Sequence, residues 1–211
     1  NGGDELFLWD SIVQDNLAPG KGGGVYSNGV LEIENSAIRR NRANDGGGIL
    51  VEGQTTIFET TISRNSAVNN SGGIGSRAFG DLTISNSTIS QNRAPTAAAL
   101  TSAWSLRTLH VTISDNVAAD GGDIDQSPNP SGFVAYATLI DGTCLNGLNT
   151  TVTSYGGNLE SPGDTCELSP ATDLLNVAIT DLALSGLATL AGATGEAQLP
   201  EPGSVAIDAI P

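Results

Sequence analysis

One short phrase, written five times, most constrains what this chain can fold into. The phrase occurs as DSIVQDNLA at 10–18, NSAIRRNRA at 35–43, TTISRNSA at 60–67, NSTISQNRA at 86–94 and VTISDNVA at 111–118. Successive copies of its final asparagine lie 25, 24, 27 and 24 residues apart. These asparagines are Asn16, Asn41, Asn65, Asn92 and Asn116. A fixed period of this length is typical of a solenoid, in which each repeat stacks on the next.

A second phrase follows each asparagine at a constant interval. It reads GGGV at 22–25, GGGI at 46–49, SGGI at 71–74, AAAL at 97–100 and GGDI at 121–124. Because both phrases keep their phase, each period is one structural unit. We expect the glycine clusters to supply positive φ angles where the chain turns sharply.

Apolar residues alternate with polar ones inside each unit, which indicates short half-buried strands rather than helices. Leu82, Ile84 and Ile89 illustrate the alternation, and three short strands per unit are visible. Three strands per period of about 25 residues predict an all-β, single-stranded right-handed parallel β-helix of about six to eight coils, closed by a C-terminal capping segment. We expect the asparagines to form a ladder at one corner. A second, interior ladder is predicted from Val13, Ile38, Ile62, Ile89 and Ile113.

The pattern divides the chain into three parts. Residues 1–125 form the repeat coils, 126–167 form irregular coils with an insertion, and 168–211 form the cap, in which SVAIDAI adds a final strand. At the other end, Leu6 and Leu8 already occupy repeat positions. We therefore expect further coils before Asn1 in the full gene product or, as alternatives, end-on docking of another subunit or a small cap built from residues 1–5.

Charge and composition narrow the function. The formal net charge is −15, with only eight lysines and arginines, so no basic surface is available for nucleic acid. No apolar run approaches the roughly 20 residues of a membrane span. An acidic chain with two cysteines fits an extracellular or cell-surface location, and we expect a disulfide between Cys144 and Cys166, with two free buried thiols as the alternative.

The two phrases together carry a resemblance. GGGI with ISRN or ISQN is similar to the GGA-[ILV] and F-x-x-N repeats of chlamydial polymorphic outer-membrane proteins, with isoleucine in place of phenylalanine. GGNLESPGDTCEL followed by EPGSVAIDAI resembles the closing segment of bacterial choice-of-anchor type extracellular proteins. The resemblance implies a secreted or cell-surface β-helix with an adhesive or structural function.

Candidate catalytic groups are few. Asp115, Asp120, Asp123 and Asp125 cluster in SDNVAADGGDID, where a solvated turn is the favoured interpretation, followed by a cation site and then by catalysis. Hydrolases of polysaccharides need converging carboxylates, and lyases need a basic residue beside a calcium cage. His110, the only histidine, falls in a polar turn column and is expected to be exposed.

Two surface features could bind a ligand. A Thr-x-Ser array runs outward over three coils (Thr61 and Ser63, Thr88 and Ser90, Thr112 and Ser114), where it could bind ice or a glycan, although strand propensity also explains it. Trp104 and Arg107 lie in the least repeat-like part of the array and are the candidate binding patch, although a Trp104 that only covers a loop is the favoured interpretation.

These observations favour a non-enzymatic secreted or cell-surface structural and adhesive protein. The alternative is a carbohydrate-binding or polysaccharide-degrading β-helix. We expect no cofactor, with a structural calcium ion as the less favoured alternative. The expected partners are other protein subunits or cell-surface glycans, without nucleic acid.

Overall fold

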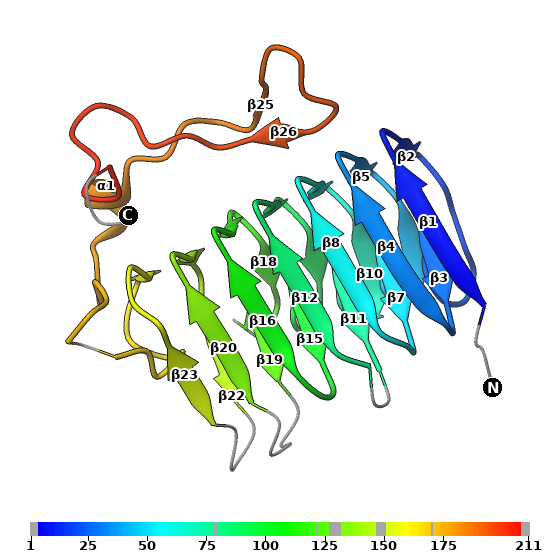
Figure 1. Cartoon of the computed structure of the whole chain (residues 1–211), viewed down its shortest axis with the longest axis horizontal. Helices are drawn as coiled ribbons and strands as arrows, with labels where there is room; N and C mark the ends of the chain where they lie inside the picture. The colour runs from blue at the N-terminus through cyan, green and yellow to red at the C-terminus, as the bar shows by residue number, and fades with distance from the viewer. Residues whose placement is uncertain are drawn as a thin grey trace.

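The computed structural model describes residues 4–77, 80–120, 122–126, 132–146, 151–169 and 171–207. Within them the chain forms a right-handed parallel β-helix of about six coils, each about 24 residues long (Figure 1). The strands of the coils pair in parallel with the equivalent strands of the next coil, so the predicted fold class is confirmed.

Four parallel sheets run along the solenoid. Sheet A contains β1 (Glu5–Trp9), β4 (Val30–Glu34), β8 (Thr55–Phe58), β12 (Leu82–Ser85), β16 (Leu106–Leu109), β20 (Phe133–Tyr136) and β23 (Val152–Ser154). Sheet B contains β2 (Ile12–Gln14), β5 (Ala37–Arg39), β9 (Thr61–Ser63), β13 (Thr88–Ser90), β17 (Thr112–Ser114), β21 (Leu139–Asp141) and β24 (Leu159–Ser161).

The other two sheets are shorter, with four described strands in sheet C and six in sheet D. Sheet C contains β6 (Arg42–Asp45), β10 (Ser66–Asn70), β14 (Arg93–Ala94) and β18 (Val117–Ala118). Sheet D contains β3 (Val25–Ser27), β7 (Ile49–Val51), β11 (Ile74–Ser76), β15 (Leu100–Ser102), β19 (Ile124–Gln126) and β22 (Cys144–Asn146). Sheet C adds a fourth strand to the unit, which the alternation of apolar and polar residues did not predict. Each of its short strands has only one inward-facing alanine, and one residue is too few to show an alternation.

The predicted isoleucine row lies in the interior of sheet B. Ile38, Ile62, Ile89 and Ile113 pair in register and are completely buried, and Val13 begins the row half-buried. The row continues through Ile140 and ends at Glu160, a buried carboxyl in the place of an aliphatic side chain.

The asparagine ladder lies at the corner between sheets B and C. The Asn65 Nδ2 donates to Asn92 Oδ1 at 3.0 Å, and the Asn41 Nδ2 donates to Asn65 Oδ1 at 3.1 Å. Asn16 and Asn116 extend the same contact at the two ends of the column. Each Nδ2 from Asn41 onward also donates to a backbone carbonyl of the preceding coil, so the ladder holds both side chains and turns.

A second polar ladder, which the sequence analysis missed, lies at the corner between sheets A and B. Its side-chain oxygens accept hydrogen bonds from backbone N–H groups one coil earlier, as from Ser36 to Thr60 and from Thr60 to Ser87. It resumes at Thr138 and Asn158 and ends at the carboxylate of Asp173. A hydroxyl column of this kind resembles ordinary strand serine and threonine in sequence, which is why it was not recognised.

The expectation that the glycine clusters supply positive φ angles is only partly correct. Only the first residue of a cluster has positive φ, at Gly22 and Gly46 and also at Ser71 and Ala97. The glycines that follow are explained by close approach: a Cβ on Gly23 would lie 2.2 Å from the Gly47 carbonyl oxygen, too close for any side chain. Most left-handed corners use other residues, including Asn35, Asn86 and His110.

The C-terminal segment does more than cap the last coil. Leu174 pairs with Leu159, and Leu182 and Ala206 pack on Leu139, so the segment does cover that end. After α1 (Ile179–Leu182) it turns back along the outside of sheet B as the short antiparallel pair β25 (Ala188–Thr189) and β26 (Glu196–Ala197) (Figure 1). We call residues 183–200 the strap.

The predicted final strand is wrong where the structure describes it. Residues 204–207 of SVAIDAI form a turn, and 208–211 lie outside the described residues. At the opposite end, the first coil exposes apolar side chains from β1, β2 and the bend after them. These residues are Leu6, Phe7, Trp9, Ile12 and Leu17.

Candidate binding groove and acidic corner

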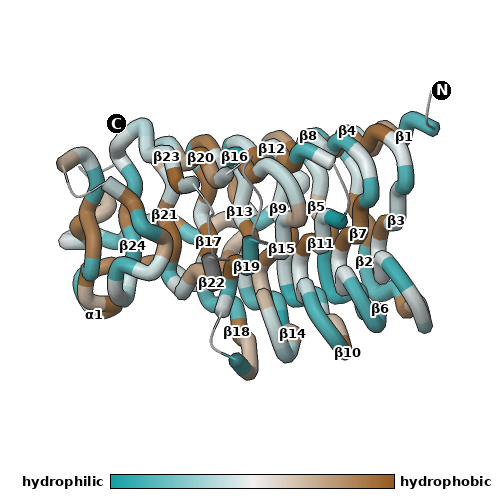
Figure 2. Tube along the Cα trace, turned by 90° about the horizontal axis from the view of Figure 1, so that it is seen from below, coloured by the Kyte–Doolittle hydropathy of each residue, from teal (hydrophilic) through white to brown (hydrophobic). Residues whose placement is uncertain are grey.

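An open groove of about 530 Å³ lies along the outer face of sheet C. Figure 2 shows its strands, β6, β10, β14 and β18, side by side along the long axis. Two arginines, a serine and several aliphatic or small side chains line the groove. Six of the lining residues are Arg42, Ser66, Val68, Arg93, Pro95 and Val117.

The repeat positions these groove residues. The residue after each ladder asparagine points outward, because the next residue is the inward-facing alanine of the unit. Arg42, Ser66, Arg93 and Val117 therefore pair in register as one outer column. Both arginines are exposed, whereas Ala43 and Ala94 beside them are buried.

The two groove arginines differ from most other basic residues of the protein in their ion pairing. Five of the eight basic residues form ion pairs with carboxylates: Lys21 with Glu52, Arg39 and Arg64 with Glu196, Arg40 with Asp15, and Arg77 with Asp45. Arg42 and Arg93 have no carboxylate within ion-pair distance in the part of the chain that the structure describes. The groove thus presents two exposed guanidinium groups that no carboxylate neutralises by an ion pair among the described residues.

An acidic corner adjoins one end of the groove, in the coil that contributes Val117 and Ala119 to the groove lining. It contains the predicted Asp115, Asp120, Asp123 and Asp125, and also Asp141, which the sequence analysis did not single out. Asp141 comes from the coil after the predicted cluster, and one-coil stacking is the signal that would have placed it there.

Asp123 is the buried member of the acidic corner. Its Oδ2 accepts a hydrogen bond from the Thr143 backbone N–H at 3.3 Å, while its buried Oδ1 has no hydrogen-bond partner in the described structure. Burial, assisted by the charges of Asp141 and Asp120, raises the pKa of Asp123 to about 7. Burial and the charge of Asp115 raise the pKa of Asp141 to about 6. Burial also raises the pKa of Asp125.

Two carboxylates of the corner face a second cavity. Asp115 and Asp141 line a space of about 360 Å³ beneath the strap, together with Gln198, whose Nε2 donates to Asp115 Oδ2 at 2.8 Å. A carboxylate pair with one raised pKa is chemically capable of acid–base work. Among the described residues, however, no three His, Cys, Asp or Glu side chains are arranged to hold a metal ion.

The overall fold agrees with the comparison to protein families. The family model described as "Right handed beta helix region" matches residues 2–161. The chain belongs to this family. No curated protein and no solved structure is significantly similar to it. The narrower resemblance to polymorphic outer-membrane or choice-of-anchor proteins is not established by the match.

The strap covers most of the outward-facing Thr-x-Ser array of this β-helix protein, while Thr112 is half-buried and Thr61 and Thr88 line a space of about 240 Å³ between sheet B and the strap. Thr61, Ser63, Thr88, Ser90 and Ser114 are buried, because the strap lies across them. The strap residue Gln198 accepts a hydrogen bond from Ser90 at 2.8 Å and another from Ser114. Repeat periodicity does not predict this cover, because the strap lies more than 80 residues away in the chain.

The remaining predicted site residues lie apart from the groove. His110 is an exposed left-handed turn residue whose ring meets the Tyr136 ring edge-on at 5.3 Å. Trp104 is half-buried in the turn between β15 and β16, and Arg107 is exposed on β16. Neither of this last pair lines the sheet C groove.

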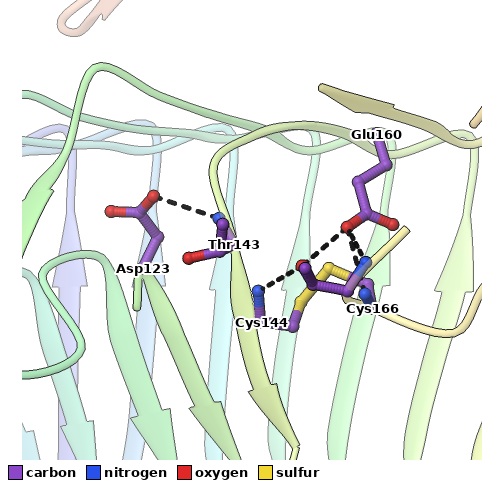
Figure 3. The surroundings of a disulfide bond; sticks show 6 residues. Asp123, Thr143, Cys144, Glu160 and Cys166 are labelled. Atoms are coloured by element: carbon purple, nitrogen blue, oxygen red, sulfur yellow. Dashed lines mark hydrogen bonds between the residues drawn. A yellow bond between two sulfur atoms is a disulfide. The ribbon is translucent and has the colours of Figure 1, made fainter. Parts of the chain in front are cut away.

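A disulfide joins Cys144 of β22 to Cys166, with Cα atoms 4.9 Å apart (Figure 3). The buried Glu160 holds the cysteine loop: its Oε1 accepts hydrogen bonds from the Thr165 N–H and hydroxyl and from the Cys166 N–H. Burial is the main cause that raises the pKa of Glu160. Within the described chain, no helix is both long and apolar enough to span a bilayer.

Proposed function

We propose that this β-helix protein is an extracellular or cell-surface adhesive protein that binds its ligand in the sheet C groove and does not transform it. The observation that carries the proposal is the lining of the groove: two arginines that pair with no carboxylate of the described residues, over an aliphatic floor. Such a lining supplies attraction and contact area, but its residues include no acid–base pair for catalysis.

Two further features support this proposal. The disulfide suits an oxidising, extracellular compartment. The hydrogen-bonded ladders make a stiff, long body, and a stiff surface loses little conformational entropy when it binds. Both features serve an adhesive protein better than one that must open and close around a reacting substrate.

A second candidate function is polysaccharide hydrolysis, which the Asp115 and Asp141 cavity favours. Glycoside hydrolases use two carboxyl groups, one of which is protonated at the working pH. The raised pKa of Asp141 beside Asp115 is consistent with the acid role. The strap covers this cavity through Gln198, and for that reason we rank binding above hydrolysis.

One experiment separates the two functions. The purified chain is incubated with immobilised and soluble polysaccharides, and both retained protein and polysaccharide chain length are measured. Retention with unchanged chain length supports adhesion. Shortened chains would overturn the non-enzymatic proposal. The carboxylate pair is implicated in that case only if Asp141→Asn abolishes the shortening while the exposed control Asp81→Asn does not.

A further inference from the structure

We propose that the sheet C groove binds an extended anionic glycan, and that Arg42 and Arg93 each pair with one carboxylate or sulfate group along it. This inference rests on the proposed adhesive function and names the ligand class of that site.

The spacing of the arginines sets the periodicity of the ligand. Ser66 of β10 pairs with Arg42 on one side and with Arg93 on the other, so the arginines stand two strands apart. Neighbouring strands lie about 4.8 Å apart, which places the two Cα atoms about 10 Å from each other. A ligand that satisfies both must therefore extend along the solenoid axis and carry negative groups at a comparable interval.

The distribution of charge on the protein favours an anionic ligand in the groove over the rest of the surface. The protein carries a formal charge of −15, which repels polyanions from most of its surface. At moderate ionic strength, screening limits that repulsion to roughly 10 Å, so a local pair of cations decides binding in the groove. Guanidinium groups suit this role, because each can hold a planar carboxylate or a sulfate through two parallel hydrogen bonds.

The groove floor accommodates a sugar ring between the charged contacts. Val68 and Val117 are about half exposed, at 49% and 47%, and Pro95 is also exposed beside them. These side chains offer apolar area to the C–H faces of a sugar, while Ser66 lies between the arginines in the outer column. A peptide strand would instead need free backbone groups, but those of β10 already pair with β6 and β14.

The test uses the whole chain and three polysaccharides of similar length: a polyuronate, a sulfated dextran and neutral dextran. Binding is measured by biolayer interferometry on each immobilised polymer. We expect the wild type to bind one or both anionic polymers and not neutral dextran. Which anionic polymer binds distinguishes carboxylate from sulfate. Binding should weaken as salt is raised from about 50 to about 300 mM.

Two variants test the residues. Arg42→Gln with Arg93→Gln should lower affinity about tenfold or more, since each change removes a charge-assisted contact. Arg40→Gln is the control: it removes an exposed arginine that lies outside the groove and pairs with Asp15, and binding should stay within about twofold. All three arginines are exposed, so we expect every variant to fold. Unchanged melting temperatures would show that they do.

Three other results would contradict the proposal in different ways. Wild-type affinity in the double variant, or an equal loss in Arg40→Gln, would overturn the assignment of the groove. Preferred binding to neutral dextran would overturn the anionic ligand but leave the adhesive function standing. Absence of binding to all three polymers contradicts this inference, and only a wider failure on cell surfaces would contradict adhesion itself.

Discussion

Each interior ladder asparagine uses both ends of its amide. Asn65 Oδ1 accepts from the backbone N–H and the side-chain amide of Asn41, while its Nδ2 donates to Ile38 O and Asn92 Oδ1. All of this happens without solvent, since Asn65 is completely buried. An aspartate lacks the donors, and a glutamine is one methylene too long, so the geometry explains the residue type.

Asp123 makes folding sensitive to pH. Its folded-state pKa of about 7 lies above its ordinary value of 3.8, so the folded protein holds the proton more tightly than the unfolded chain. The stability that this group contributes is fully present below about pH 4 and is lost as the pH rises through about 7. Asp141, with a pKa of about 6, acts in the same direction.

Asp123→Asn should therefore flatten the pH dependence of stability between about pH 4 and about pH 8, because asparagine keeps the shape and does not ionise. Melting temperatures by calorimetry across this range measure the effect. The exposed Asp81→Asn serves as control and should retain the wild-type slope. A slope in Asp123→Asn as steep as that of the wild type would show that this carboxyl does not cause the pH dependence.

Among the elements, the strap depends on a few polar contacts with sheet B. The Gln198 Oε1 accepts from Ser90 and Ser114, and its Nε2 donates to Asp115 and to the Ser185 carbonyl. Glu196 adds hydrogen bonds with Thr61 and an ion pair with Arg64 at 2.7 Å. Residues 183–200 thus have little independent core and follow the surface that the sheet provides.

Gln198→Ala should loosen the strap and leave the solenoid intact. The change removes partners from two buried serine hydroxyls, at a cost of about 2 kcal/mol. Hydrogen exchange resolved by mass spectrometry should quicken over residues 185–200 and stay slow at the ladder asparagines. Glu201→Ala, at an exposed neighbouring position, should change neither. Uniformly faster exchange along the whole chain would mean instead that the strap and solenoid unfold as one unit.

At the scale of the whole molecule, the last described coil depends on a covalent link. The Cys144–Cys166 disulfide ties sheet D to the loop after β24, where the isoleucine row has already given way to Glu160. The coils before it stack by repetition, while this end is held by a disulfide, a buried carboxyl and the C-terminal segment.

Replacing both cysteines by serine should lower the free energy of unfolding by about 3 kcal/mol, because the unfolded chain loses the constraint on a loop of this size. Urea unfolding followed by circular dichroism measures the change. Reduced wild-type protein should unfold at the same urea concentration as the double variant. An unchanged midpoint in both samples would show that the disulfide adds nothing to stability.

The amino-acid sequence by itself determined the solenoid, the strand positions of sheets A, B and D, the Ile38 to Ile113 row and the asparagine ladder. It could do so because stacking turns a sequence period into a spatial contact, so equal positions in successive units must meet. Only the tertiary structure decided the path of the strap, the burial of the Thr-x-Ser array and the approach of Asp141 to Asp123. The strap has no repeat that would place it, and its docking follows from hydrogen bonds between residues far apart in the chain, which periodicity does not encode.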